Sequence, residues 1–285
     1  MEWFEAIILG LVQGLTEFLP VSSSGHLEIG KVILGVEATD DLLFTTMVHA
    51  ATVLSTVVVF RSQLGYLVKG FFTGLKDWRL VKDTEGRFVL SCNDQTDYLF
   101  KIAVSMIPVF IVGVFFKDFV EGLFGSITVV GFALVVTAVL LFFSDFASRP
   151  GRKSIFPVNE SRNGISYWQA LAVGLGQAFA VIPGLSRSGT TISTGLICGV
   201  RRENMAQFSF LMVLVPVLGE SFLEIVGGGL AASSVSSLCL ALGFISAFLS
   251  GLFACKAMIA IVKKAKLSWF AFYCLLAAAM IFIFS

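Results

Sequence analysis

The sequence predicts an all-α integral membrane protein with six transmembrane helices and two re-entrant helix-turn-helix hairpins, in an interdigitated inverted-topology repeat. Its apolar composition, its long apolar segments and a pair of similar polar turns predict this fold. Of the 285 residues, 56% are hydrophobic and 14% charged, with a mean hydropathy of +0.90, whereas soluble domains carry about 25% charged residues. This excludes a soluble protein. The net charge of +1 gives no general attraction to nucleic acid, so we expect no nucleic-acid partner.

Six apolar segments are long enough to span a membrane, since a bilayer core of about 30 Å needs about 20 helical residues. They are residues 44–60, 98–116, 127–146, 208–226, 235–262 and 268–284. Lys and Arg concentrate in every second connection: in 61–97, expected as a solvated loop, after the third span, and before the sixth. By the positive-inside rule these connections are cytoplasmic, which puts both chain ends on the outer face.

Two shorter apolar stretches do not fit this scheme of spans. Residues 3–19 and 167–182 are each followed by a turn rich in Ser and Gly and then by a second apolar run. Such a turn would be costly in contact with lipid. We therefore expect two hairpins that enter the membrane and leave it by the same side.

The two hairpins resemble each other. Aligning the chain with itself pairs Gly10 with Gly174, Leu11 with Leu175, Gln13 with Gln177, Ser22 with Ser186, Ser24 with Ser188 and Gly25 with Gly189. Three spans separate the copies, so the second copy is inserted upside down. The chain is then one membrane domain, 1–285, built from inverted repeats of about 1–146 and 147–285. In such folds broken helices point their dipoles at a bound ion or substrate.

The first turn combines a carboxylate with hydroxyl groups and an imidazole. Gln13 and Glu17 lie on one helix face, and a carboxylate within the membrane is expected to face the protein interior or water. The turn that follows contains Ser22, Ser23, Ser24, Gly25 and His26. Because the turn opens a helix, its free N–H groups and the positive end of the helix dipole favour an anion.

The second turn supplies a fixed cation. It reads Pro183-Gly-Leu-Ser-Arg-Ser-Gly-Thr-Thr191, and a guanidinium such as that of Arg187 can bind a phosphate through two hydrogen bonds. If the turns meet, they enclose a phosphate-sized pocket, and Ser23 then lies close to Arg187.

Several polar residues can be interpreted in two ways or have no assigned role. The hydroxyls of Ser22, Ser24 and Ser188 could equally satisfy backbone groups. His49 fits either a hydrogen bond between helices or a pocket role, and Glu28, Glu220 and Glu224 have no assigned role. We expect the ammonium groups of Lys101 and Lys256, inside predicted spans, to extend to the membrane surface. The five cysteines show no metal-binding spacing and are interpreted as small hydrophobic residues.

At both turns the sequence resembles the undecaprenyl-diphosphate phosphatase family of bacterial inner membranes, also called bacitracin-resistance proteins. Gln13-Gly-Leu-Thr-Glu-Phe-Leu-Pro-Val-Ser-Ser-Ser-Gly-His26 is similar to the family's first motif, and Pro183 to Thr191 to its second. The resemblance covers essentially the whole chain. It implies a hydrolase of a phosphoric anhydride, which releases the terminal phosphate of a C55 polyprenyl diphosphate and recycles the lipid carrier of peptidoglycan synthesis. It also implies tolerance to bacitracin, through the shared substrate, and an active site open to the outer (periplasmic) side.

The resemblance and the turn chemistry together define the expected site. The expected catalytic residues are Glu17, Ser23, His26 and Arg187. The expected substrate-binding residues are Gln13, Ser22, Ser24, Gly25, Ser186, Ser188, Gly189, Thr190 and Thr191. No organic cofactor is expected. The resemblance implies dependence on a divalent cation, Mg²⁺ or Ca²⁺, with Glu17 as ligand, but Gln13 stands where many members have Glu, which weakens a two-carboxylate metal site.

Three questions stay open at the level of sequence. The nucleophile could be Ser23, His26 or a water molecule activated by Glu17. Broken helices with one Arg would also suit a polyprenyl-phosphate flippase or another anion transporter, although the cluster of Ser, His and Glu favours hydrolysis. A homodimer is compatible with the sequence, which does not determine the oligomeric state.

Overall fold

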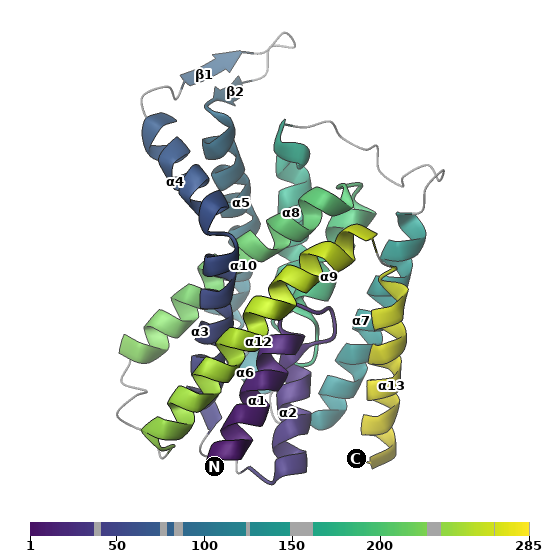
Figure 1. Cartoon of the computed structure of the whole chain (residues 1–285). Helices are drawn as coiled ribbons and strands as arrows, with labels where there is room; N and C mark the ends of the chain where they lie inside the picture. Colours follow the sequence, from purple (N-terminus) through teal and green to yellow (C-terminus); the bar gives the residue numbers. More distant parts are fainter. Residues whose placement is uncertain are drawn as a thin grey trace.

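The computed structural model describes residues 1–36, 41–74, 79–82, 88–123, 126–148, 162–226, 235–264 and 266–284. Within these residues the chain is almost entirely helical, and Figure 1 shows the helices gathered in one bundle. The helices are α1 (Trp3–Thr16), α2 (Ser23–Leu34), α3 (Asp41–Val59), α4 (Arg61–Gly74), α5 (Asp94–Phe115), α6 (Lys117–Glu121), α7 (Ile127–Ala147), α8 (Tyr167–Phe179), α9 (Arg187–Ile197), α10 (Arg202–Val226), α12 (Ser237–Lys264) and α13 (Ser268–Phe284). A 3-10 turn, η2 (Arg162–Gly164), precedes α8, and β1 (Arg79–Lys82) pairs with β2 (Phe88–Ser91).

All six segments predicted to span the membrane are helical, in α3, α5, α7, α10, α12 and α13. By length and composition, three helices of the described chain can cross a membrane: α5, α7 and α12. A fourth candidate arises if α3 and α4 form one span, although they are bent by 74° at their junction. The structure therefore supports a helical membrane protein with three to four span candidates.

The connection 61–97, expected as a solvated loop, contains regular structure. Helix α4 turns back along α5, and Asn93 Nδ2 donates a hydrogen bond to Gly70 O over 2.6 Å. A Cβ atom at Gly74 would lie 2.7 Å from Asn93 Cγ, so glycine permits this close approach. The antiparallel hairpin of β1 and β2 pairs Arg79 with Ser91, and Figure 1 places it at the end of the molecule opposite to both chain termini.

Glycines let α1 pack closely on α12. A Cβ atom at Gly14 would lie 2.5 Å from the carbonyl oxygen of Ala247, and one at Gly10 would collide with the backbone of Gly243. Helix α8 approaches α5 in the same way, because a Cβ atom at Gly174 would lie 2.8 Å from the carbonyl carbon of Ser105. Both hairpins are thus held by helices distant from them in sequence.

The remaining helices complete the bundle around a common core. Helix α3 packs against α12 and α10, and α7 packs against α13 and α9. The largest fully buried side chains of the main core include Phe208, Met205, Met212, Met258, Leu134 and Leu141. This packing brings α3, α9 and α10 around the end of α1.

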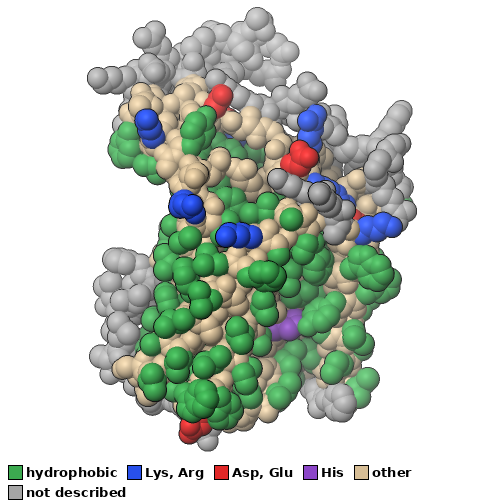
Figure 2. Space-filling model, viewed as in Figure 1, with side chains coloured by type: hydrophobic (Ala, Val, Ile, Leu, Met, Phe, Trp, Pro, Cys, Tyr) green, Lys and Arg blue, Asp and Glu red, His purple; other side chains and the backbone are tan. Residues whose placement is uncertain are grey.

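The surface carries many large apolar side chains. Phe115, Trp269 and Phe253 are 74%, 73% and 70% exposed. Figure 2 shows hydrophobic side chains across most of one face, with Lys and Arg in its upper half, toward β1 and β2. Such a surface suits contact with lipid, because water would make extended apolar exposure unfavourable.

The expectation that Lys101 extends to the membrane surface is wrong. Lys101 is buried, and its ammonium group donates to Asp97 Oδ2 over 2.5 Å. Asp97 lies one helical turn earlier on the same helix face, and Tyr167 and Asn163 also donate hydrogen bonds to its carboxylate. A nearby carboxylate therefore holds the cation inside the protein. Lys256, in contrast, is exposed.

Candidate functional site

The first turn is held in an unusual backbone conformation. Helix α1 ends before Glu17, and Pro20, four residues after Thr16, lacks the N–H that a continuing helix would need. Ser22 caps α2 with φ 71°, a region that non-glycine residues rarely adopt, and its Oγ accepts a hydrogen bond from Gly25 N over 3.2 Å. This conformation places Ser23 as the first residue of α2.

The second turn also has a serine cap, Ser186, but its positive φ falls two residues before the cap, at a glycine. Gly184 has φ 85°, and a Cβ atom there would lie 2.6 Å from Val130 Cα, so no larger residue fits without movement. Ser186 caps α9, and its Oγ accepts a hydrogen bond from Gly189 N over 3.0 Å. Arg187 is therefore the first residue of α9, as Ser23 is of α2.

The two turns contact each other directly. Gly184 N donates to Ser24 Oγ over 3.3 Å, and Ser188 Oγ donates to the carbonyl oxygen of Leu19 over 3.1 Å. Gly189 lies where a Cβ atom would be 3.2 Å from Pro20 Cβ. The sequence prediction that the turns meet is confirmed by these contacts.

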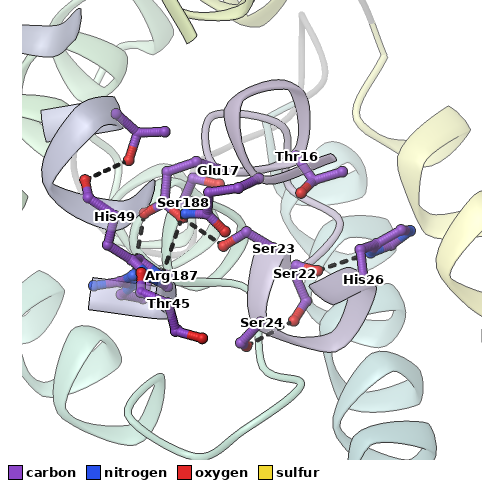
Figure 3. A network of polar contacts seen from close by, with 12 residues as sticks. Thr16, Glu17, Ser22, Ser23, Ser24, His26, Thr45, His49, Arg187 and Ser188 are labelled. Atoms are coloured by element: carbon purple, nitrogen blue, oxygen red, sulfur yellow. Dashed lines mark hydrogen bonds and ion pairs between the residues drawn. The ribbon is translucent and has the colours of Figure 1, made fainter. Parts of the chain in front are cut away.

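Glu17 is the centre of the polar network (Figure 3). Its Oε2 atom accepts hydrogen bonds from Ser23 Oγ at 2.5 Å and from Gln13 Nε2 at 2.8 Å. Its Oε1 atom accepts one from an Arg187 Nη at 3.1 Å, and His49 Nε2 lies 3.8 Å from Oε2. The Glu17 side chain is only 10% exposed, so these partners replace water around its charge. Ser23 and Arg187 thus meet at one carboxylate, as expected.

His26 points away from this network in Figure 3. Its Nδ1 atom lies 2.8 Å from the carbonyl oxygen of Ser22, and its Nε2 atom 2.7 Å from the hydroxyl of Tyr273, on which its ring stacks. Because a carbonyl only accepts, Nδ1 carries a proton, and Nε2 of the neutral ring accepts from Tyr273. The structure therefore places His26 toward α13 and away from Glu17.

The other expected binding residues mainly shape the two turns. Thr191 Oγ1 donates to the carbonyl oxygen of Arg187 over 2.8 Å and lies 2.6 Å from Ser209 Oγ. Ser186 N donates to Thr137 Oγ1 over 3.2 Å. The hydroxyl of Thr190 is buried and has no hydrogen-bond partner. Among the binding residues, Ser188 lines the pocket described next.

A pocket opens beside the carboxylate. Its polar lining consists of Glu17, Arg187, Ser188, Thr52, Thr56 and Ser209. Its apolar lining consists of Phe18, Val53, Phe210, Val213 and Leu214. The pocket thus joins charged hydrogen-bonding groups to a hydrocarbon surface.

Helix α3 supplies site residues that the sequence analysis did not assign. His49, Thr52 and Thr56 occupy positions i, i+3 and i+7 and so share one helix face. A polar face on an apolar span is a signal that could have found them. Of the two interpretations of His49, its position beside Glu17 favours a pocket role over a hydrogen bond between helices. Glu28 forms an ion pair with Lys31 at 3.0 Å, and the side chains of Glu220 and Glu224 lie outside the described residues.

The donor set for a divalent cation is limited. In the part of the chain that the structure describes, no group of three or more His, Cys, Asp or Glu residues is arranged around a common point. The site offers the Glu17 carboxylate and the Oε1 atom of Gln13, which is buried without a hydrogen-bond partner. Mg²⁺ is often held by one or two carboxylates together with water and substrate phosphates, so this small set fits a cation that binds with its substrate.

Comparison with known proteins covers nearly the whole chain. The family model described as bacitracin resistance protein BacA matches residues 6–280. A Bacteroides fragilis protein named undecaprenyl-diphosphatase is 47% identical over 289 residues, covering 100% of this chain and 99% of that protein. Proteins of the same name from Parabacteroides distasonis and Halothermothrix orenii are 49% and 36% identical, with 97% and 99% of this chain covered and 96% and 98% of their own lengths.

Proposed function

The chain belongs to the bacitracin resistance protein BacA family, and on this basis we propose that it hydrolyses undecaprenyl diphosphate to undecaprenyl phosphate and inorganic phosphate. The reaction recycles the lipid carrier of peptidoglycan synthesis and gives tolerance to bacitracin, which binds the same substrate. One observation carries the proposal: Ser23 and Arg187, from turns far apart in sequence, are both hydrogen-bonded to Glu17 beside a pocket with an apolar side.

Arg187 and the two helix starts bind the diphosphate. Ser23 and Arg187 begin α2 and α9, so the positive ends of both helix dipoles face the meeting point of the turns. Arg187 donates hydrogen bonds to the phosphate oxygens and neutralises charge in the transition state, which is the main requirement of phosphoryl transfer. Ser188 and the caps at Ser22 and Ser186 support this anion site.

Ser23 is the nucleophile, and Glu17 is its general base. The 2.5 Å hydrogen bond from Ser23 Oγ to Glu17 supports this assignment. As Oγ attacks the terminal phosphorus, its proton passes to Glu17, the anhydride bond breaks, and undecaprenyl phosphate leaves. Water then hydrolyses the phosphoserine and releases inorganic phosphate. In the second version of the mechanism, Glu17 activates water directly and Ser23 only orients the phosphate. A phosphoserine trapped on Ser23 would distinguish them.

His26 is assigned to proton transfer at the leaving oxygen or at water. This role requires a change of partner, because its Nε2 atom is bonded to Tyr273. The Tyr273→Phe variant tests this role. Loss of the tyrosine hydroxyl frees the Nε2 atom of His26 and is expected to change the rate of phosphate release by less than about tenfold.

A divalent cation, Mg²⁺ or Ca²⁺, would be held by Glu17 and Gln13 Oε1 together with the phosphate oxygens of the substrate. When bound, it would add positive charge next to the diphosphate. Gln13 also donates to Glu17 through Nε2 and so orients the carboxylate. Activity measured with and without EDTA tests the requirement.

The fold is assigned as two inverted repeats with six spans and two re-entrant hairpins. Support comes from the contacts between helices: α1 packs on α12 as α8 packs on α5, and α3 meets α12 as α10 meets α5. Exchanging the two halves of the chain therefore relates the two contacts within each of these pairs.

The membrane orientation puts both termini and the active site on the outer side of the bacterial inner membrane. Both chain ends lie at one end of the molecule, and Lys and Arg gather toward the other on the visible face (Figures 1 and 2). A cysteine introduced at Arg79 is then labelled only from the cytoplasm, and labelling from outside would reverse the orientation.

The central experiment measures phosphate release from farnesyl and undecaprenyl diphosphate by purified protein in detergent. Wild type is expected to release phosphate, and Glu17→Ala and Arg187→Ala to lose most activity. The flippase hypothesis would replace this function if wild type released no phosphate with any divalent cation while proteoliposomes still translocated prenyl phosphate. The names of the relatives favour hydrolysis.

A further inference from the structure

The pocket beside Glu17 is lined by both polar and apolar residues on two helices. On α3, Thr52 belongs to its polar lining and the next residue, Val53, to its apolar lining. On α10, Ser209 and Phe210 are related in the same way. On α3 the polar Thr56 follows Val53 by one turn, so the change from polar to apolar lining runs along α10, where Phe210, Val213 and Leu214 follow Ser209.

The apolar part is a built surface of the protein interior. Val53, Phe210 and Leu214 are 5%, 5% and 6% exposed, although all three line the pocket. The ring of Phe210 packs edge-on against Phe18 with centroids 5.8 Å apart. These side chains are fixed by packing and present hydrocarbon to the pocket, whereas Val213 is half-buried at its margin.

The hydroxyl groups on the same helices are hydrogen-bonded within the protein. Thr52 Oγ1 donates to the carbonyl oxygen of His49 over 2.7 Å, and Ser209 Oγ lies 2.6 Å from Thr191 Oγ1. A ligand with its phosphates at Arg187 would therefore have its next carbon atoms against α3 and α10. On the other side of α2, the stacked pair of His26 and Tyr273 occupies the space toward α13.

We infer that Val53, Val213 and Leu214 form the seat of the first isoprene unit of the substrate. This inference rests on the proposed function. These three residues, rather than the polar residues of the turns, then determine how well the branched hydrocarbon next to the diphosphate is accepted.

The test fills the seat and measures chain and headgroup binding separately. The variant Val213→Phe is compared with Val215→Phe, two residues along the same helix, where Val215 is 56% exposed and outside the pocket. We expect Val213→Phe to raise KM for farnesyl diphosphate at least about tenfold, because the ring occupies the place of the isoprene unit. Inorganic diphosphate, which has no chain, is expected to inhibit competitively, and its Ki is expected to change less than about threefold in either variant.

A second measurement covers the case in which Val213→Phe fails to fold. Modification of Val213→Cys by a maleimide is expected to be slowed by saturating farnesyl diphosphate and unaffected by inorganic diphosphate. Val215→Cys gives the unprotected rate, and wild type gives the background from the native cysteines. The proposed seat is wrong if Val213→Phe and Val215→Phe change KM for farnesyl diphosphate equally. It is also wrong if farnesyl diphosphate does not slow the modification of Val213→Cys.

Failure of the seat is distinguishable from failure of the proposed function. If wild type releases phosphate but the Val213 variants behave as their Val215 controls, only the position of the chain is wrong. If wild type releases no phosphate, the protection of Val213→Cys still reports whether a prenyl diphosphate occupies the seat.

Discussion

Arg187 donates a hydrogen bond to Glu17 across 170 positions of sequence, with 3.1 Å between Arg187 Nη and Glu17 Oε1. Each residue alone would be an unusual charge in an apolar chain. Together they form an ion pair in which each charge neutralises the other while no phosphate is bound. If Arg187 binds the diphosphate as proposed, the substrate competes with Glu17 for the guanidinium, so substrate binding and release of the carboxylate are linked.

Replacing the guanidinium tests this link. We expect Arg187→Ala to lower kcat/KM for farnesyl diphosphate about a hundredfold to a thousandfold, the usual effect of removing one donor to a transition-state anion. Arg187→Lys should recover only part of the activity, because an ammonium group cannot reproduce the planar geometry of two donors. Arg201→Ala, at an exposed position, is the matched control. Full activity of Arg187→Lys would contradict recognition through two hydrogen bonds.

The three consecutive serines of the first turn allow a comparison within one segment. Ser23 donates to Glu17, whereas Ser24 accepts a hydrogen bond from Gly184. Ser23→Ala is expected to lower kcat at least about a thousandfold, because the proposed nucleophile is lost. Ser24→Ala should lower it less than about tenfold. Steady-state phosphate release checks both, and equal losses would argue for a purely structural turn.

The equivalent glutamines of the two hairpins should behave differently. Gln13 donates a hydrogen bond to the Glu17 carboxylate. In the second copy Val181 stands at the position that aligns with Glu17, so Gln177 has no such carboxylate to orient. Gln177 is buried, and its Oε1 atom has no hydrogen-bond partner. We expect Gln13→Leu to lower kcat about tenfold. Gln177→Leu should leave the rate unchanged and keep or raise the Tm, since it removes a buried carbonyl oxygen that accepts no hydrogen bond. Equal rates for the two variants would show that Gln13 does not position Glu17.

The contact between α1 and α12 should tolerate no added methyl group. A Cβ atom at Gly14 meets the backbone at Ala247 O, so Gly14→Ala is expected to destabilise the protein by about 1–3 kcal/mol. Gly113→Ala on α5 is the control, because nothing lies within 4 Å of its added atom. There the change should be neutral or stabilising by up to about 1 kcal/mol. Thermal unfolding in detergent compares them, and an unchanged Tm for Gly14→Ala would contradict the tight packing.

Asp145 joins three helices and should matter for stability rather than chemistry. Its carboxylate accepts from Arg202 and from Ser268 Oγ, both at 2.5 Å. Asp145→Asn is expected to lower the free energy of unfolding by about 2 kcal/mol, a value between those typical of exposed and of buried ion pairs. Glu28→Gln removes a partner of Lys31, whose side chain is 7% exposed, but Glu28 itself is 33% exposed, so the loss of stability is expected to be smaller than for Asp145→Asn. KM is expected to stay unchanged in both, and a selective rise for Asp145→Asn would instead place it near the substrate.

The sequence predicted the parts of the site that depend on local pattern. Ser- and Gly-rich turns between apolar helices identified Ser23 and Arg187, and their likeness predicted that the turns meet. The position of His49 depends on how α3 packs beside α1, which no local pattern contains. The same limitation applies to His26, whose direction is determined by Tyr273 on α13, and to Lys101, whose burial depends on Asp97, Asn163 and Tyr167 forming one network.

The glycine face of α1 has a consequence for biosynthesis. Gly10 and Gly14 pack against α12, which lies near the end of the chain. When the ribosome has made only the first half, this face has no partner, and the Glu17 turn beside it lacks Arg187. If the first hairpin is re-entrant as proposed, it must therefore remain in the membrane with its polar turn until most of the chain has been translated. Nascent chains stalled before α12 should accordingly depend on the insertion machinery or on membrane chaperones, and be early targets of quality-control proteases.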